Sequence, residues 1–163
     1  MKPRRTTGPD GAVVLLNDLK AHLRVDSTDE DDLIEALEKA AVAHLDGWRG
    51  ILGRCIKRQT WEVDYDTAGV FRLPFPDVVE IAASAGEAKL GFDKMGAHVS
   101  ITEACTVSMV CELPADALDA VKLIIKLLVG HWYQNREAST ELSLKDTPIA
   151  VDALLSPIKW RQI

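Results

Sequence analysis

The first third of the chain has apolar residues at helical spacing, with polar and acidic residues between them. This pattern predicts a short amphipathic helix from about residue 15 to 25 and then a longer one. The longer helix has a clear start, because Ser27 stands three residues before Glu30, as in a capping box, and acidic residues there oppose the positive end of the helix dipole. Its predicted apolar face consists of Leu33, Leu37, Ala40, Ala41, Leu45 and Trp48.

The middle of the chain changes to a two-residue period, which is typical of strands with one buried face. Trp61, Val63 and Tyr65 alternate there with acidic residues. We expect further strands in the segments VFRLPFP, DVVEIAAS, HVSIT and TVSMVCEL, and turns at Gly86, Gly91 and Gly96. Together these segments predict a small antiparallel sheet.

A long helix is predicted after Pro114, because a proline is harmless in the first turn of a helix. A last short helix is expected after Pro148. The predicted fold class is α+β and mainly α-helical, with a helical core, a long helix in the C-terminal half and a small antiparallel β section in the middle. The broad apolar face of the long helix consists of Leu118, Val121, Ile124, Ile125, Leu128, Val129 and Trp132.

The length of 163 residues allows one hydrophobic core and makes two full-sized domains improbable on size alone. We therefore expect a single domain over residues 13–156. Residues 1–12 are basic and contain proline and glycine, which predicts a flexible tail, with a tail that orders against an acidic partner as the alternative. Residues 157–163 form a basic and aromatic C-terminal tail.

The formal net charge is −6, and this limits the classes of partner. Phosphate binding needs clustered lysine and arginine, so an acidic chain is unsuited to wrapping nucleic acid. An acidic surface does suit the wall of a channel through which DNA passes without binding. The basic N-terminus is not followed by the apolar region of a signal peptide, and no apolar run approaches the roughly 20 residues that span a bilayer. We expect synthesis in the cytoplasm and no membrane association.

No residues in the sequence have the spacing of a catalytic or ligand-binding motif. The GxSxG motif and glycine-rich phosphate loops are missing, and the four histidines are scattered. Cys55, Cys105 and Cys111 form no CxxC pair and are expected to be reduced. The acidic run DSTDEDD lacks the spacing of an EF-hand and suits a helix start better. We therefore expect no enzymatic activity, no catalytic residue, no cofactor and no metal.

Aromatic residues near arginines are the candidate contact residues, because both protein interfaces and nucleic-acid stacking use them. Trp160 is the best candidate, since it lies near the end of the chain with no obvious core to join. Trp132 lies on the apolar face of the long helix and suits the core better. The candidate set for a portal or subunit contact is Trp160, Arg161, Lys159, Ile158, Tyr133 and Arg136.

The order of these segments resembles the head-tail connector family of long-tailed phages, also called head-tail adaptors, which occurs in prophages and gene transfer agents as well. The resemblance covers roughly residues 15–160, and HWYQNREA together with LLSP is its most telling part. The glycine-rich middle from Ala85 to Ala97 and the basic N-terminal tail depart from it. The similar runs are LKAHLRVDSTDEDDLIEALEKAAVAHLDGWRG, LPADALDAVKLIIKLLVGHWYQNREA and PIAVDALLSPIKW.

The resemblance implies a structural subunit that assembles as a ring of about a dozen copies between the portal and the tail. The implied partners are the portal protein, the next tail or stopper protein and further copies of the chain, while DNA passes through the ring. The C-terminal segment with Trp160 and Arg161 resembles the part that reaches the portal. The expected location is the head-tail junction of a virion or phage-like particle, after synthesis in the bacterial cytoplasm.

Three alternatives stay open at this point. A small DNA-binding or DNA-packaging accessory protein requires the basic residues at both ends of the chain to converge on one patch. An enzyme of unknown chemistry requires a convergent catalytic set that the sequence does not display. A monomeric α+β domain without a fixed partner requires only the core.

Overall fold

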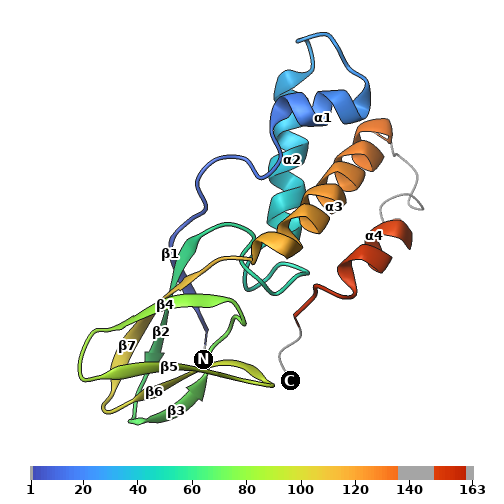
Figure 1. The fold of residues 1–163 in the computed structure, drawn as a ribbon. Helices are drawn as coiled ribbons and strands as arrows, with labels where there is room; N and C mark the ends of the chain where they lie inside the picture. Colours follow the sequence, from blue (N-terminus) through green and yellow to red (C-terminus); the bar gives the residue numbers. More distant parts are fainter. Residues whose placement is uncertain (1, 136–148, 161–163) are drawn as a thin grey trace. The chain divides into compact units, whose positions relative to one another are not determined.

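The computed structural model describes residues 2–135 and 149–160, which form four helices and seven strands (Figure 1). The prediction of a mainly α-helical fold is wrong, because the strands run through most of the chain between residues 59 and 111 and one more lies near the N-terminus. The fold is a mixed α+β fold with two antiparallel sheets.

The contacts divide the chain into two compact units. The β unit consists of Met1–Asp10, Asp46–Pro114 and Trp160–Ile163, and the helical unit consists of Gly11–Leu45 and Ala115–Lys159. Each unit is therefore built from segments that are distant in the sequence. The single domain expected over residues 13–156 stays a prediction.

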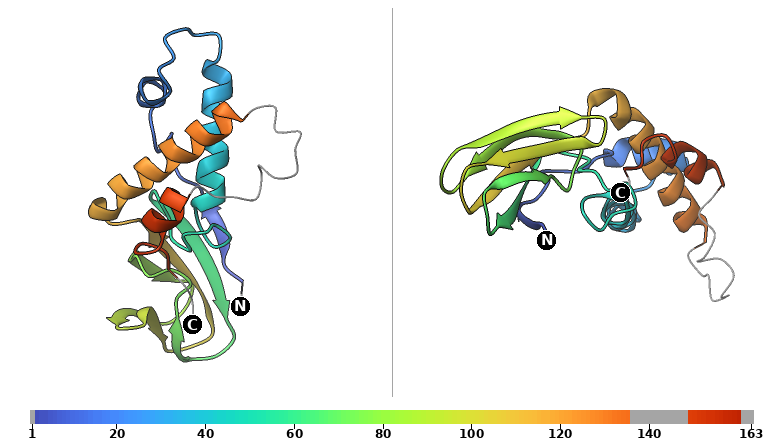
Figure 2. Two further views of the ribbon diagram at one scale, coloured as in Figure 1. Left: turned by 90° about the vertical axis from the view of Figure 1, so that its right-hand side faces the viewer. Right: turned by 90° about the horizontal axis from the view of Figure 1, so that it is seen from below.

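The β unit consists of two antiparallel sheets, which Figure 2 shows from two further directions. The four-stranded sheet has the order β1 (Arg4–Thr7), β2 (Gln59–Tyr65), β7 (Cys105–Cys111) and β4 (Val78–Ala83). The three-stranded sheet has the order β3 (Gly69–Arg72), β6 (Gly96–Ile101) and β5 (Ala88–Asp93). Every ladder within the two sheets is antiparallel.

The core of the β unit follows the predicted two-residue period. Trp61, Val63 and Tyr65 are buried on β2, and their ladder partners on β7 are buried as well. Phe75 packs on Trp61 with 5.0 Å between ring centroids. Val99 of β6 belongs to the same buried cluster, so the inner faces of the two sheets share one core. Each fully buried side chain of this size stabilises the fold by about 1.5–3 kcal/mol.

Two strands occur where the sequence analysis predicted none. Arg4–Thr7 form β1, which pairs with β2. That residues 1–12 form a flexible tail stays a prediction. Ala88–Asp93 form β5, and Gly91 lies inside this strand rather than in a turn. Gly91 faces His98 of β6, where a Cβ would lie 2.4 Å from the imidazole Nε2. The backbone needs glycine there because of this close approach.

The helical unit contains α1 (Leu16–Leu23), α2 (Asp31–Leu45), α3 (Ala115–Gln134) and α4 (Ile149–Leu155). The predicted apolar face of α3 is confirmed at Val121, Ile124, Ile125, Leu128 and Val129, all of which are buried. No helix among the described residues is long and apolar enough to cross a membrane.

The buried face of α2 differs from the predicted one. Ile34, Ala41 and Leu45 are buried, whereas Leu33 is 36% exposed. Glu38 lies on the buried face, because its carboxylate Oε1 accepts the amide hydrogens of Val13 and Val14. The prediction considered only apolar residues, so it could not place a charged residue such as Glu38 on the buried face of α2.

Candidate partner-binding site

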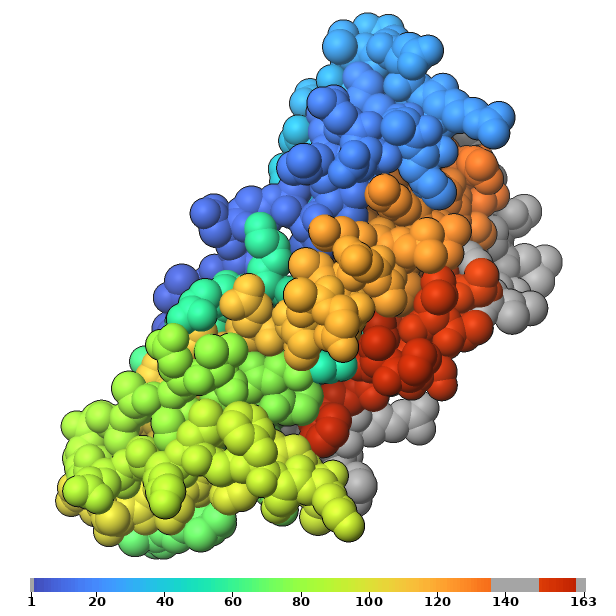
Figure 3. Space-filling model, viewed as in Figure 1, coloured from blue at the N-terminus to red at the C-terminus, as the bar shows by residue number. Residues whose placement is uncertain are grey.

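The β5–β6 hairpin has two large exposed apolar residues beside its turn. Phe92 is 60% exposed and Met95 is 52% exposed, and they flank the turn that connects the two strands. Figure 3 shows this yellow-green turn projecting from the surface of the β unit. Aromatic residues and methionine are enriched at protein interfaces, so two of them beside one turn mark it as a candidate contact.

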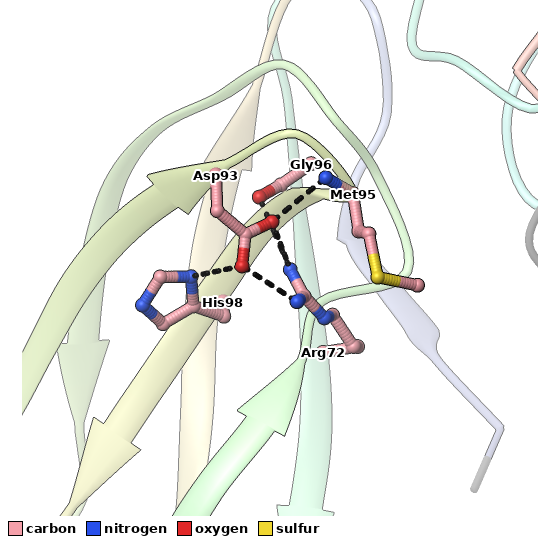
Figure 4. Close-up of polar contacts among 5 residues, drawn as sticks. All are labelled: Arg72, Asp93, Met95, Gly96 and His98. Carbon is pink, nitrogen blue, oxygen red and sulfur yellow. Dashed lines mark hydrogen bonds and ion pairs between the residues drawn. The ribbon is translucent and has the colours of Figure 1, made fainter.

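The turn is fixed by a polar network around Asp93 (Figure 4). The Arg72 guanidinium donates to both carboxylate oxygens of Asp93, at 2.6 Å each, and also to the carbonyl of Gly96 at 3.4 Å. The Met95 amide donates to Asp93 Oδ1 at 2.8 Å. The hydrogen bond from Arg72 and then that from Met95 lower the pKa of Asp93 to about 2. The carboxylate therefore stays charged near neutral pH, and the turn keeps this conformation.

His98 extends the network toward the middle of the sheet. Its Nδ1 lies 3.9 Å from Asp93 Oδ2, and this nitrogen is buried without a hydrogen-bond partner among the described residues. The ring occupies the space above Gly91 that any Cβ there would need. The three-stranded sheet thus brings the Arg72 guanidinium, the Asp93 carboxylate and the His98 imidazole together.

Trp160 lies against the same turn. Its amide donates to the Leu52 carbonyl at 2.8 Å, and its own carbonyl would lie 2.6 Å from a Cβ at Gly53. Its indole Cζ2 would lie 2.7 Å from a Cβ at Gly96. The structure therefore gives Trp160 a packing site on the β unit, which the sequence analysis did not find. The indole Nε1 is buried and has no partner within residues 2–135 and 149–160.

The other candidate contact residues belong to the helical unit or lie outside the described residues. Ile158 and Lys159 belong to the helical unit and end α4 with hydrogen bonds to the Leu155 carbonyl, at 3.1 Å and 2.9 Å. Tyr133 lies on α3, where its hydroxyl donates to the carboxylate of Glu30. Arg136 and Arg161 lie outside the described residues. That these six residues contact a portal or a subunit stays a prediction.

No protein-family model matches this chain, and no curated protein matches it. Several solved structures share its fold, and two of them are from gene transfer agent particles. A chain from the neck of an empty gene transfer agent (GTA) particle, computed with C6 symmetry, is 16% identical, with a TM-score of 0.72 over 100% of this chain and 97% of that chain. A chain from the virion of a native GTA particle is also 16% identical, with a TM-score of 0.68 over the same shares.

This chain therefore shares its fold with chains found in GTA particles. The likeness includes both compact units, because it covers the whole of this chain. At 16% sequence identity, this likeness establishes the architecture alone. Which residues form contacts has to be argued from the geometry of this chain.

Phe92 and Met95 were missed by the sequence analysis, which treated residues 85–97 as a glycine-rich connection. The signal that marks them is the run FDKMG, in which apolar residues stand on both sides of Asp93 and Lys94. Turns between strands are normally polar, so apolar residues there have a purpose other than packing.

No group of three or more potential metal ligands comes together among the described residues.

Proposed function

We propose that this chain is a structural head-tail connector subunit, which forms a ring between the portal and the tail of a phage or phage-like particle and extends the DNA channel. The observation that carries the proposal is the end-to-end likeness to a chain of a GTA neck, with 100% of this chain and 97% of that chain covered. A shared core alone would leave one of the two units unmatched. The proposed role is mechanical, with no enzymatic step.

The proposed assembly is a closed homo-oligomer. The GTA neck was computed with six-fold symmetry, and a ring of about a dozen copies obeys that symmetry. A ring needs two different faces on each subunit that fit each other by rotation. The exposed apolar residues of this chain lie on several elements, among them Leu15 before α1, Leu123 on α3 and Val79 on β4. This distribution supports more than one contact face.

The proposed portal contact is the C-terminal segment together with the β5–β6 turn. Trp160 packs beside this turn, so the predicted anchor and the two exposed apolar residues, Phe92 and Met95, form one neighbourhood. The polar network around Asp93 holds the turn, which reduces the entropy that ordering costs when a partner binds. The next tail or stopper protein is the proposed partner of the opposite ring face.

Passage of DNA without specific binding fits the pairing of the basic residues. Arg4 is paired with Glu62 at 2.6 Å, Arg5 with Asp46 at 3.6 Å, and Arg58 with Glu80 at 2.8 Å. A DNA-binding accessory protein requires such arginines to face phosphates. Their carboxylate partners disfavour that alternative.

The test is electron microscopy and mass analysis of the protein mixed with the portal protein of the same particle. We expect the full chain to add a ring to the portal, and a chain truncated after Ser156 to lose this addition. Phe92→Ser with Met95→Ser should weaken the addition as well. The matched control is Val79→Ser, which removes an exposed apolar side chain from the same unit, 50% exposed, away from the turn.

Circular dichroism of each variant separates loss of contact from loss of fold, because Trp160 also packs on its own chain. A full chain that leaves the portal unchanged, but shifts DNA in a gel with strong salt dependence, would replace the connector proposal by the DNA-binding alternative. Ring addition that survives the truncation would keep the connector role and reject the C-terminal contact.

A further inference from the structure

We infer that β1 is an exchangeable strand, which docks on β2 of a neighbouring copy of the chain in the assembled state. The surface concerned is the outer edge of β2, and the partner is the Arg4–Thr7 segment of a second copy. The inference deepens the proposed function and rests on it for the presence of a close neighbour. It names one contact by which adjacent subunits are joined.

The first observation is that β1 contributes nothing to the core. All four of its residues are exposed, whereas β2 beside it alternates between buried and less buried positions. The ladder is short and irregular, with a register shift between Arg5 and Thr7. A strand without a buried side chain is held by main-chain hydrogen bonds and by contacts of its exposed side chains, so its removal takes no side chain out of the hydrophobic core.

The second observation is a charge match between β1 and its docking edge. Arg4 pairs with Glu62, whose hydrogen bond raises the pKa of Arg4. Arg5 lies 3.6 Å from the buried carboxylate of Asp46 and 5.7 Å above the ring of Trp61. These contacts recognise the chemistry of a basic strand, and they are indifferent to which copy supplies it.

The third observation is the covalent connection. Residues 8–58 separate β1 from β2, so no tight turn obliges β1 to pair with its own chain. Gly8 has open space around it, Gly11 has a φ of +64°, and the boundary between the two units falls between Asp10 and Gly11. On the helical side of this boundary, the Val13 amide donates to Glu38 at 2.8 Å, and on the other side the Asp10 carbonyl accepts a hydrogen bond from Lys57.

These features set the reach of the strand. The chain from Thr7 to Val13 spans at most about 20 Å when fully extended, at about 3.3–3.6 Å per residue. Only a copy whose β2 edge comes within about this distance can receive the strand. Exchange keeps every contact of β1, and such swapping of an identical element is a low-cost route to assembly. The balance therefore depends on the local concentration of neighbouring copies.

The experiment uses disulfide trapping between positions 4 and 62, which are directly opposite in the ladder. Opposite residues of an antiparallel pair have Cα atoms about 4.5–5.5 Å apart, within the range of a disulfide. Arg4→Cys protein and Glu62→Cys protein are mixed, unfolded in urea, refolded together at high concentration and oxidised with glutathione disulfide. The native cysteines Cys55, Cys105 and Cys111 are buried and stay out of the reaction.

The matched control is the mixture of Asp64→Cys and Thr106→Cys proteins. These positions are opposite on β2 and β7, and their side chains are hydrogen-bonded at 2.7 Å. Because β2 and β7 both belong to the core of one unit, their pairing does not exchange. We expect several-fold more covalent heterodimer from the first mixture than from the control. With an effective concentration of about 1 mM for the tethered strand, about a tenth of the chains should be exchanged at about 0.1 mM protein.

An Arg4→Cys, Glu62→Cys double variant completes the design. If it closes an intrachain disulfide while the mixture gives no more heterodimer than the control, β1 stays on its own chain and the inference is overturned. If neither product forms, β1 does not dock at this register and the inference fails as well. Disulfide trapping is done without the portal protein, so its result is independent of the portal-binding experiment. If trapping gives the heterodimer but the portal experiment shows no added ring, the connector proposal fails and strand exchange stands.

Discussion

Replacement of Glu38 by alanine should destabilise the helical unit more than any other charge removal on α2. Glu38 is 5% exposed, and its Oε1 accepts the Val13 amide at 2.8 Å and the Val14 amide at 3.3 Å. Val14 is itself buried, so its amide would lose its acceptor inside the unit. A hydrogen bond to a charged group contributes about 1.5–3 kcal/mol, and the second bond is long. We expect a loss of about 2–4 kcal/mol.

The assay is urea unfolding followed by circular dichroism at a helical wavelength. The matched control is Glu35→Ala on the same helix, whose side chain is 51% exposed and lies 3.7 Å from Lys39. An exposed pair of this kind contributes about 0.3–0.5 kcal/mol, so the control should barely shift the midpoint. Both substitutions gain the same helix propensity, which therefore cancels in the comparison.

Glu38→Gln tests the cause of the effect. The amide retains one acceptor oxygen, so this variant should lie between the native chain and Glu38→Ala. A Glu38→Ala midpoint no lower than that of Glu35→Ala would refute the reasoning, because it would mean that the two amide bonds add nothing to the folded state.

Three further predictions concern the β unit. Burial raises the pKa of Tyr65 to about 12 and its hydroxyl lacks a partner among the described residues, so Tyr65→Phe should raise the melting temperature, with a gain of up to about 1 kcal/mol. Burial also raises the pKa of Asp46, so the stability that its protonated form provides is lost as the pH rises above about 4. Urea titrations should therefore show Asp46→Asn gaining stability relative to the native chain as the pH rises above this value. Gly91→Ala should lower the melting temperature and cost about 1–3 kcal/mol in the free energy of unfolding, since its Cβ would lie 2.4 Å from His98 Nε2.

The sequence pattern succeeded where an element has one buried face. Trp61, Val63 and Tyr65 repeat every second residue, and the apolar residues of α3 repeat at helical spacing, because each set faces a core. These elements could be located from hydrophobicity alone. The mainly helical estimate was wrong in part because it lacked two strands, β1 and β5.

The elements that the pattern missed have other causes. All of β1 is exposed, so its position is set by main-chain pairing with β2 and by ion pairs, neither of which leaves an apolar period. Gly91 suggested a turn, although it lies inside β5, where the ring of His98 on β6 occupies the space that a Cβ would need. Trp160 packs against Gly53 and Gly96, which are distant from it in the sequence. Each of these depends on a partner that only the folded chain brings near.

These missed features are also the ones that suit an assembly protein. A core specifies the fold of one subunit, and contact with neighbours must come from what the core leaves over: an edge strand without buried residues, a turn with exposed apolar side chains, and an aromatic residue near the chain end. Strand β1, the β5–β6 turn and Trp160 are of these three kinds. Under the proposed function, we therefore expect the determinants of partner choice in β1 and the β5–β6 turn, which lie outside the buried cluster of the β unit.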